Sequence, residues 1–324
     1  DPGQAQPESG VNAAEPTIAS MRERLGGYAS EVLVFHPGAP ESLSAHKRLV
    51  RLVGTPGSSV VGSCVAALRG NQWLADWALA HHGRSLQALL LLEDSVPLVI
   101  LSGDPGTGKS VTLRNLAGAS SVFLGLPVVS IRLNERLRGT GIQGRAGSEV
   151  VGVFESIGQL AASSHWPIVV ALDEAEAVAG HRVTSDVGSG EKENTAVLDG
   201  LVKGLDALAI SGARVVVVFA TNMLERIDPA IVRRAQVYAF DRPDDAARLS
   251  ILDCALGDVF SEMELKELCR KTFRNDLPLT GADILNQVVQ PAIRSAASAS
   301  RPLTLEDVAS LAEGAVATRP VVQG

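Results

Sequence analysis

Eight consecutive residues near the middle of the chain have the types and spacing of a phosphate-binding loop. They read GDPGTGKS from Gly103 to Ser110 and fill every fixed position of the pattern G-x-x-x-x-G-K-[ST]. The glycines let consecutive backbone N–H groups point inward at a phosphate, and Lys109 adds a positive charge for the outer phosphates. The Ser110 hydroxyl is a ligand of the kind that Mg²⁺ takes beside phosphate oxygens. The loop therefore predicts a site for a nucleoside triphosphate and Mg²⁺.

The expected nucleotide contacts extend one position past this loop. A strand-like run, PLVILS, precedes it and a helix-like run, VTLRNLAG, follows it, so the positive end of a helix is expected to face the phosphates. The predicted contacts are Gly103, Asp104, Pro105, Gly106, Thr107, Gly108, Lys109, Ser110 and Val111.

An acidic pair and an amide follow two further apolar runs. Asp173 and Glu174 end the run IVVALDE, and Asn222 follows ARVVVVFAT. We expect Asp173 to complete the Mg²⁺ shell with Ser110, and Glu174 to polarise the water that attacks the γ-phosphate. Asn222 can orient the same water. The alternatives are two acids that cap a strand and an ordinary turn residue.

Two adjacent arginines, Arg233 and Arg234, lie in IDPAIVRRAQ near the end of the predicted sheet. Arginine is always ionised and presents a planar fork of donors, which suits the charge that develops on a transferred phosphoryl group. An arginine supplied by a neighbouring subunit would couple hydrolysis to assembly. The alternative is a solvated pair at a helix end.

The elements that must position these residues alternate between strand and helix. Short apolar runs predict five strands buried on both faces of a doubly wound parallel sheet, with ligands at the carboxyl ends of the strands. The predicted strands cover 97–103, 126–133, 167–174, 213–221 and 237–240, and the helices between them cover 109–119, 148–163 and 194–209. After Asp241 the strand patterns stop and helical periodicity takes over, which predicts an α/β fold with a C-terminal helical lid.

The chain divides by composition into four parts. The first 28 residues are rich in Pro, Gly, Ala and Ser and are expected to be a disordered tail. Within the second part, EVLVFH and KRLVRLV are predicted as strands and NQWLADWALAHHGRSLQALLLL as a helix, while the polar stretch 181–196 is predicted as a flexible loop. The predicted parts are the tail 1–28, a mixed lead-in 29–95, a large α/β subdomain 96–241 and the helical lid 242–324.

Composition also limits the function classes. A formal net charge of −7 over 324 residues argues against a nucleic-acid partner. Three widely separated cysteines indicate neither a disulfide framework nor a zinc site, as fits the cytoplasm. The longest apolar stretch, LQALLLLEDSVPLVIL, is interrupted by Glu93, Asp94 and Pro97, which argues against a membrane span of about 20 residues.

The ordered set of motifs GDPGTGKS, VVALDEAEAV, FATN, IDPAIVRRA and LTGADI resembles the AAA+ ATPases from residue 97 to about 300. The resemblance implies the AAA+ fold, ATP with Mg²⁺ and a homohexameric ring. It also implies a sensor role for Asn222, arginine fingers at Arg233 and Arg234, and nucleotide contacts from the lid at Gly281 and Ala282. The interval from Gly144 to Phe154 is the one that follows the first pore loop in this family. By that resemblance the loop at 139–147 grips substrate through Ile142, Gln143 and Gly144.

A finer resemblance is to the pachytene checkpoint ATPases, carried by LDEAEAV, NTAVLDGLVKGLDAL and ERIDPAIVRRAQVYAF. Members of that family remodel HORMA-domain proteins, and short bacterial relatives act beside cyclic-oligonucleotide synthases in antiphage operons. The resemblance implies an ATP-driven protein remodeller with Arg234 as the better-matched finger. The chain departs from it at Ala282, where the checkpoint enzymes carry an arginine.

Two alternatives remain open. A DNA-associated ATPase, of the helicase or transposition-loader type, would need a basic pore, and several arginines surround the predicted pore loop: Arg132, Arg136, Arg138 and Arg145. A regulatory scaffold would bind ATP and assemble without much turnover. Measured turnover and salt-dependent DNA binding separate these alternatives from a protein remodeller.

Overall fold

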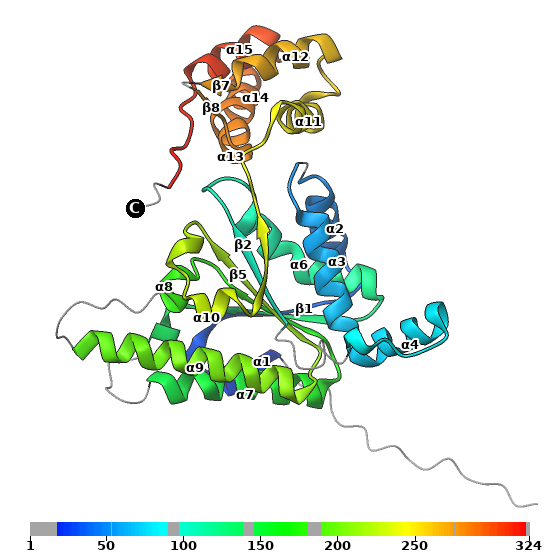
Figure 1. The fold of residues 1–324 in the computed structure, drawn as a ribbon. Helices are drawn as coiled ribbons and strands as arrows, with labels where there is room; N and C mark the ends of the chain where they lie inside the picture. The colour runs from blue at the N-terminus through cyan, green and yellow to red at the C-terminus, as the bar shows by residue number, and fades with distance from the viewer. Residues whose placement is uncertain are drawn as a thin grey trace, which may run out of the picture.

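The structure of the chain is a computed structural model that describes residues 18–52, 54–89, 97–138, 146–180, 189–274 and 276–321. A twisted sheet with helices on both faces forms the larger part, and a helical lid stands above one edge of that sheet (Figure 1). The lid comprises residues 245–314. No helix in the described ranges is long and apolar enough to cross a membrane.

The sheet contains six strands in the order β1-β3-β4-β5-β2-β6. Five of them are parallel, as predicted. The sixth, β1, contains most of the run EVLVFH that was predicted as a strand, and it adds an antiparallel edge against β3 that the predicted five-stranded sheet did not include. Every residue of β4 and β5 is buried, which is why these runs consist almost entirely of valine, isoleucine, leucine, alanine and phenylalanine. The strands are β1 (Ala29–Phe35), β2 (Leu98–Ser102), β3 (Val128–Leu133), β4 (Ile168–Leu172), β5 (Val215–Thr221) and β6 (Ala235–Ala239).

Each face of the sheet has its own hydrophobic core. The helices of one core are α1 (Ile18–Leu25), α7 (Ala146–Ser164) and α9 (Ser189–Ser211). The other core is covered by α2 (Pro40–Val50), α3 (Gly57–Arg69) and α6 (Lys109–Leu124), and α4 (Asn71–His82) extends from α3. Short turns complete this part: η1 (Gly26–Tyr28), η2 (Glu135–Arg138), α8 (Glu176–Ala179), η3 (Leu224–Arg226) and α10 (Pro229–Val232).

Helices α7 and α9 approach each other closely because glycines line their contact. A Cβ atom on Gly200 would lie 2.3 Å from the carbonyl oxygen of Gly147, and one on Gly204 would lie 2.8 Å from the ring of Phe154. The close approach lets both helices cover the face of the sheet that includes β4, the strand that ends at the acidic pair.

Four local predictions were wrong. The helix predicted over NQWLADWALAHHGRSLQALLLL ends as α4 at His82, where Gly83 caps it in the left-handed conformation with a φ angle of 65°. Residues 18–28 are not part of a disordered tail, because α1 buries Met21 and Leu25 in the sheet core. KRLVRLV is not a strand; most of it is the last turn of α2, which starts at a proline, has Glu41 in its first turn and has Lys47 and Arg48 in its last. The part of the predicted loop from 189 to 196 is the start of α9.

The lid has a separate core formed by its helices. Three of these begin with capping boxes: Ser261 with Glu264, Thr280 with Asp283 and Thr304 with Asp307. A two-stranded hairpin interrupts the helices, which the helix-only prediction for this region did not include. The elements are α11 (Asp245–Leu256), α12 (Glu262–Lys271), β7 (Phe273–Arg274), β8 (Leu277–Pro278), α13 (Gly281–Asp283), the π-helix η4 (Ile284–Val289), α14 (Gln290–Ser298) and α15 (Leu305–Gly314).

Residues 315–321, called here the C-terminal strap, run from α15 back toward the sheet (Figure 1). The lid holds the strap through Gln287, whose side chain both donates to and accepts from the backbone of Val316. The amide of Val321 reaches the Asp104 carboxylate at 3.3 Å. The strap therefore connects the lid to the phosphate-binding loop.

Candidate nucleotide-binding site

The phosphate-binding loop lies between β2 and α6, and its glycines adopt backbone conformations that other residues avoid. The φ angles of Gly103, Gly106 and Gly108 are 150°, 83° and 106°. A Cβ atom on Gly103 would lie 2.1 Å from the carbonyl oxygen of Phe240, and one on Gly106 would lie 2.5 Å from Thr280 Oγ1. The glycine pattern found in the sequence is thus required both by the curl of the loop and by the close packing of its neighbours.

The ammonium group of Lys109 lies inside this loop. It donates to the carbonyl oxygens of Gly103 at 2.6 Å and Asp104 at 2.7 Å, and the residue is 5% exposed. Burial lowers the pKa of Lys109 to about 8, against the opposing effect of nearby carboxylates, chiefly Asp104 and Asp173. The group still carries most of its charge at pH 7, and it is bonded to backbone oxygens that phosphate oxygens could replace.

The predicted magnesium ligands lie together at the end of β4. Ser110 Oγ donates to Asp173 Oδ1 at 3.3 Å, although 63 positions separate them in the chain. Hydroxyl and carboxylate oxygens suit Mg²⁺, which also takes phosphate and water ligands. Among the described residues, no group of three or more His, Cys, Asp and Glu side chains could hold a metal ion alone. The donor set therefore fits a magnesium ion that is bound with a nucleotide.

Glu174 has a strained backbone. Its φ angle is +52°, in the left-handed region that a residue with a side chain seldom occupies, and its N–H donates to Asp173 Oδ1 at 3.2 Å. Such strain clusters at functional sites because surrounding structure must hold it in place. The turn leaves both Asp173 and Glu174 exposed beside the phosphate-binding loop.

The sequence analysis missed a third acid in this motif, Glu176. The charge of Glu176 acts on Lys109, and its Oε2 atom is buried with no hydrogen-bond partner among the described residues. The sequence LDEAE could have indicated this third acid, because Glu176 lies two positions after Glu174 and begins the short helix α8, close to the loop. Glu176 therefore belongs to the electrostatic environment of the site.

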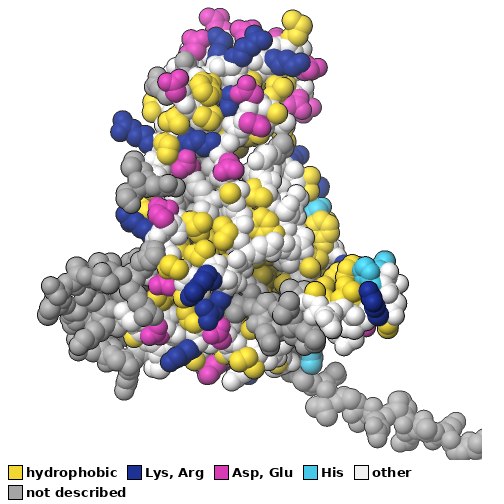
Figure 2. Space-filling view, viewed as in Figure 1, with side chains coloured by type: hydrophobic (Ala, Val, Ile, Leu, Met, Phe, Trp, Pro, Cys, Tyr) yellow, Lys and Arg dark blue, Asp and Glu magenta, His cyan; other side chains and the backbone are white. Residues whose placement is uncertain are grey.

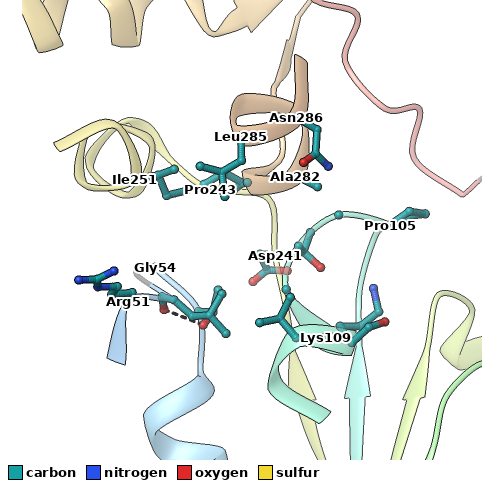
Figure 3. Close-up of a pocket in the computed structure, with 18 of the residues that line it drawn as sticks. Arg51, Gly54, Pro105, Lys109, Asp241, Pro243, Ile251, Ala282, Leu285 and Asn286 are labelled. Carbon is teal, nitrogen blue, oxygen red and sulfur yellow. Dashed lines mark hydrogen bonds between the residues drawn. The ribbon is translucent and has the colours of Figure 1, made fainter. Parts of the chain in front are cut away.

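A cavity of about 640 Å³ lies between the sheet and the lid. Its lining includes the predicted residues Pro105 to Val111 and also Asn222, Gly281 and Ala282. Figure 3 shows the lid residues Ile251, Ala282 and Leu285 facing Lys109 and Gly54 across this space. The volume is in the usual range for small-molecule sites, and a triphosphate at Lys109 would place its base against the apolar wall.

That far wall comes from segments to which the sequence analysis gave no role. The connection between α2 and α3 and the lid contribute most of it: Arg51, Leu52, Gly54, Thr55, Pro243, Ile251, Cys254, Ala255, Leu285 and Asn286. No motif marks these residues, because apolar and small side chains from distant segments become a pocket only in the folded chain. Part of the lead-in 29–95 thus has a place in the site.

The first turn of the lid helix contacts the phosphate-binding loop directly. Ala282 N–H donates to the carbonyl oxygen of Gly106 at 3.1 Å, and Thr280 caps this turn in a capping box with Asp283. The structure thus brings Gly281 and Ala282 to the loop, where the resemblance placed them.

The two arginines lie outside this cavity. Arg234 forms a two-pronged contact with Asp206 on α9, with distances of 3.2 and 3.4 Å. Arg233 is exposed, and its Nε donates to the carbonyl oxygen of Pro229 at 3.3 Å. Neither residue lines the cavity of its own chain. This position is compatible with action on the site of another subunit. The predicted pore residues Ile142, Gln143 and Gly144 lie outside the described residues.

Residues 99–241 match the sequence profile described as ATPase family associated with various cellular activities (AAA). These residues form an AAA ATPase domain. Among relatives of this AAA ATPase, CD-NTase-associated protein 6 of Escherichia coli strain KTE188 is 29% identical over 250 residues, which is 74% of this chain and 80% of that protein. The alignment includes most of both chains, so it extends beyond the AAA match alone.

Solved structures share the fold of this AAA ATPase. A chain in a structure titled E. coli MS115-1 HORMA:CdnC:Trip13 complex matches with a TM-score of 0.80 and 23% identity, covering 92% of this chain and 99% of that one. A Rhizobiales Trip13 structure matches with a TM-score of 0.69 and 20% identity, covering 90% and 100%. At these identities the likeness establishes the AAA fold, from the lead-in to the lid.

Proposed function

We propose that this AAA ATPase hydrolyses ATP in a homohexameric ring and uses the energy to remodel a HORMA-domain protein, in the cytoplasm and in an antiphage setting. The ATPase part is carried by Lys109 and Ser110, which line the cavity, and by Asp173, which accepts a hydrogen bond from Ser110. The near-complete match to a chain from a complex that contains HORMA and CdnC supports the choice of substrate.

The residues of the site divide the work of hydrolysis. Lys109 would leave the carbonyl oxygens of Gly103 and Asp104 to neutralise the outer phosphates. Ser110 and Asp173 would hold Mg²⁺, which when bound neutralises charge on the phosphates. Glu174 would take up the proton of the attacking water, and Asn222 would orient that water. The strained turn, held by the bond from the Glu174 N–H to Asp173, would keep Glu174 beside the loop.

Completion of the site requires a second subunit in this proposal. Arg233 and Arg234 lie away from the cavity of their own chain, so a neighbour would supply them to the γ-phosphate. Hydrolysis in one subunit would then depend on its contact with the next. The loop around Ile142 and Gln143 would grip the substrate in the central pore, as the family resemblance implies.

The alternative of a DNA-associated ATPase has less support. Arg132, one of the arginines near the predicted pore, is paired with Glu31 at 3.2 Å. On the face of the molecule in Figure 2, basic and acidic side chains are interspersed over the lid. A DNA-binding surface usually presents a basic stripe.

Turnover of the purified chain tests the enzymatic part. We expect Mg²⁺-dependent release of phosphate from ATP by the wild type and its near-complete loss in Glu174→Gln, with ATP binding retained. Glu155→Gln is the matched control, because Glu155 is exposed on α7 and remote from the cavity lining. Equal turnover by the wild type and Glu174→Gln would contradict the proposal.

A further inference from the structure

One guanidinium group at the junction of sheet and lid is bonded to three separate segments. Arg242 lies between β6 and α11, and its Nε donates to Asp104 Oδ2 in the phosphate-binding loop at 2.6 Å. Its Nη1 donates to the carbonyl oxygen of Pro278 in β8 at 3.1 Å. Its Nη2 donates to the carbonyl oxygen of Thr318 in the strap at 2.5 Å. The loop, the lid and the strap therefore meet at this side chain.

The Arg242–Asp104 pair is largely shielded from water. The two side chains are 11% and 23% exposed, and the second carboxylate oxygen of Asp104 accepts the N–H of Val321. A pair in such surroundings is screened much less than a surface pair. Removing one partner would leave the other charge partly buried, which is costly. The pair is thus a firm connection between Asp104 and the segments bonded to Arg242.

The strap is fixed to the lid at its other end. Thr318 donates to Asp283 through its N–H at 3.1 Å and its hydroxyl at 2.7 Å. Burial alone would raise the pKa of Asp283, but the hydrogen bonds from Thr318 and Thr280 hold that pKa below its ordinary value. Asp283 therefore stays a charged acceptor, and a shift of the lid would move the strap against Asp104.

Asp104 also responds to what Lys109 binds. The Asp104 carboxylate interacts favourably with the ammonium group of Lys109. When phosphate oxygens take up that ammonium group, the carboxylate faces new negative charge. Arg242 is then the cation that is hydrogen-bonded to Asp104, so the attraction between the two side chains contributes more to stabilising this carboxylate. Nucleotide binding should tighten the connection to the lid and the strap.

We infer that Arg242 and Asp104 form a clamp that couples nucleotide occupancy to closure of the lid and the strap. Arg242 acts as a positioning residue, because it touches Asp104 and not the cavity. The inference rests on the proposed function in one respect, that ATP is the ligand. The clamp would connect the bound phosphates to the lid in a chain whose first lid turn has Ala282 in place of an arginine.

Hydrogen exchange at the strap amides tests the clamp. In the Glu174→Gln background with Mg-ATP, exchange at Thr318 and Val321 should slow by a factor in the usual range of site-to-site coupling, about 5- to 150-fold. Adding Arg242→Lys should abolish this slowing while ATP still saturates the site. The inference would be overturned if exchange slowed as much in the chain with Arg242→Lys as without it. It would also be overturned if Mg-ATP bound to the Glu174→Gln chain without changing exchange at Thr318 and Val321.

A double-mutant cycle provides a second measurement. Coupling is reciprocal, so Arg242→Lys and Asp104→Asn should each lower the affinity for ATP. The double variant should bind ATP no more weakly than the weaker of the two single variants. Arg301→Lys is the control, because Arg301 pairs with Asp307 within the lid at 2.6 Å. Additive losses would overturn the clamp.

Failure of the clamp and failure of the proposed function give different results. A wild-type chain that binds no ATP would refute the proposed function. The same cycle measured on melting temperature without nucleotide then judges the clamp: non-additive losses support the Arg242–Asp104 connection, and additive losses overturn it.

Discussion

Ser110 Oγ lies 3.3 Å from Asp173 Oδ1, so a hydroxyl from the start of α6 and a carboxylate from the end of β4 meet at one point. The parallel order of the sheet produces this contact, because β5 lies between β2 and β4 and the carboxyl ends of all three strands meet at the same edge. The pair supplies two oxygen ligands beside the phosphate-binding loop.

Asp173→Asn should weaken Mg-ATP binding much more than metal-free ATP binding, because the amide lacks the charge that attracts the cation. Titrations with ATP in Mg²⁺ and in EDTA measure the two affinities. Asp199→Asn, on α9, is a suitable control for the loss of one negative charge. A similar loss of affinity in both conditions would show that Asp173 does not serve the metal.

ATP affinity should fall as the pH rises through about 8, the pKa of Lys109 in the free protein, because the triphosphate needs the ammonium form. Above that pKa the loss should approach about tenfold per pH unit. Lys109→Arg keeps its charge and should show a flat profile at these pH values. A wild-type profile as flat as that of Lys109→Arg would contradict the assigned role.

The nucleotide-free protein should show the opposite trend in stability. Burial lowers the pKa of Lys109 from 10.5 to about 8, so the unfolded chain binds more protons between these values. The contribution of Lys109 to the free energy of unfolding should therefore rise with pH across this window. Chemical denaturation of the wild type and Lys109→Met at pH values of about 7.5 and about 9.5, below and above the lowered pKa, isolates this contribution.

Gly106→Ala should lower both ATP affinity and stability. The φ angle of +83° disfavours alanine by about 1–2 kcal/mol, and the added Cβ would lie 2.5 Å from Thr280 Oγ1 at the lid. Gly152→Ala is the control, since Gly152 lies on α7 with open space beside it and alanine there should stabilise the helix by about 1 kcal/mol. Thermal unfolding with and without ATP compares the two; an unchanged ATP response in Gly106→Ala would contradict the role of this contact.

Arg234→Ala should reduce turnover by about 10³-fold while ATP still binds, because a finger acts on the transition state. Mixing it with Lys109→Ala subunits should restore activity, since an intact site then meets an intact finger. Asp206→Asn separates this role from folding, because it breaks the ion pair with Arg234 and keeps the arginine. Failure of mixed subunits to recover activity, under conditions in which they exchange, would contradict an intersubunit site.

The site could be predicted from sequence where its chemistry depends on consecutive residues. GDPGTGKS and VVALDE specify both the residue types and the strand ends that hold them, and the five parallel strands follow from short, almost wholly apolar runs. The cavity wall formed by Leu52, Thr55, Ile251 and Leu285 could not be predicted, because no local sequence pattern distinguishes these residues and only folding brings them together.

The N-terminal errors have a similar physical origin. Helix α1 is eight residues long, and only Met21 and Leu25 fix its buried face, which is too little for a periodic pattern. KRLVRLV contains a short apolar cluster that suits a strand locally, and its helical state depends on the packing of α2 against α6. Tertiary contacts outweighed local preference in both cases.

Capture of substrate by the Glu174→Gln chain tests the central claim most directly. Without the carboxylate that activates water, the ring should remain in the ATP-bound state and hold a substrate that it grips only in that state. The measurement is pull-down of a purified HORMA-domain protein from the same host, with ATP and with ADP. The account predicts retention by Glu174→Gln in ATP and release in ADP; no retention by a variant that demonstrably binds ATP would contradict it.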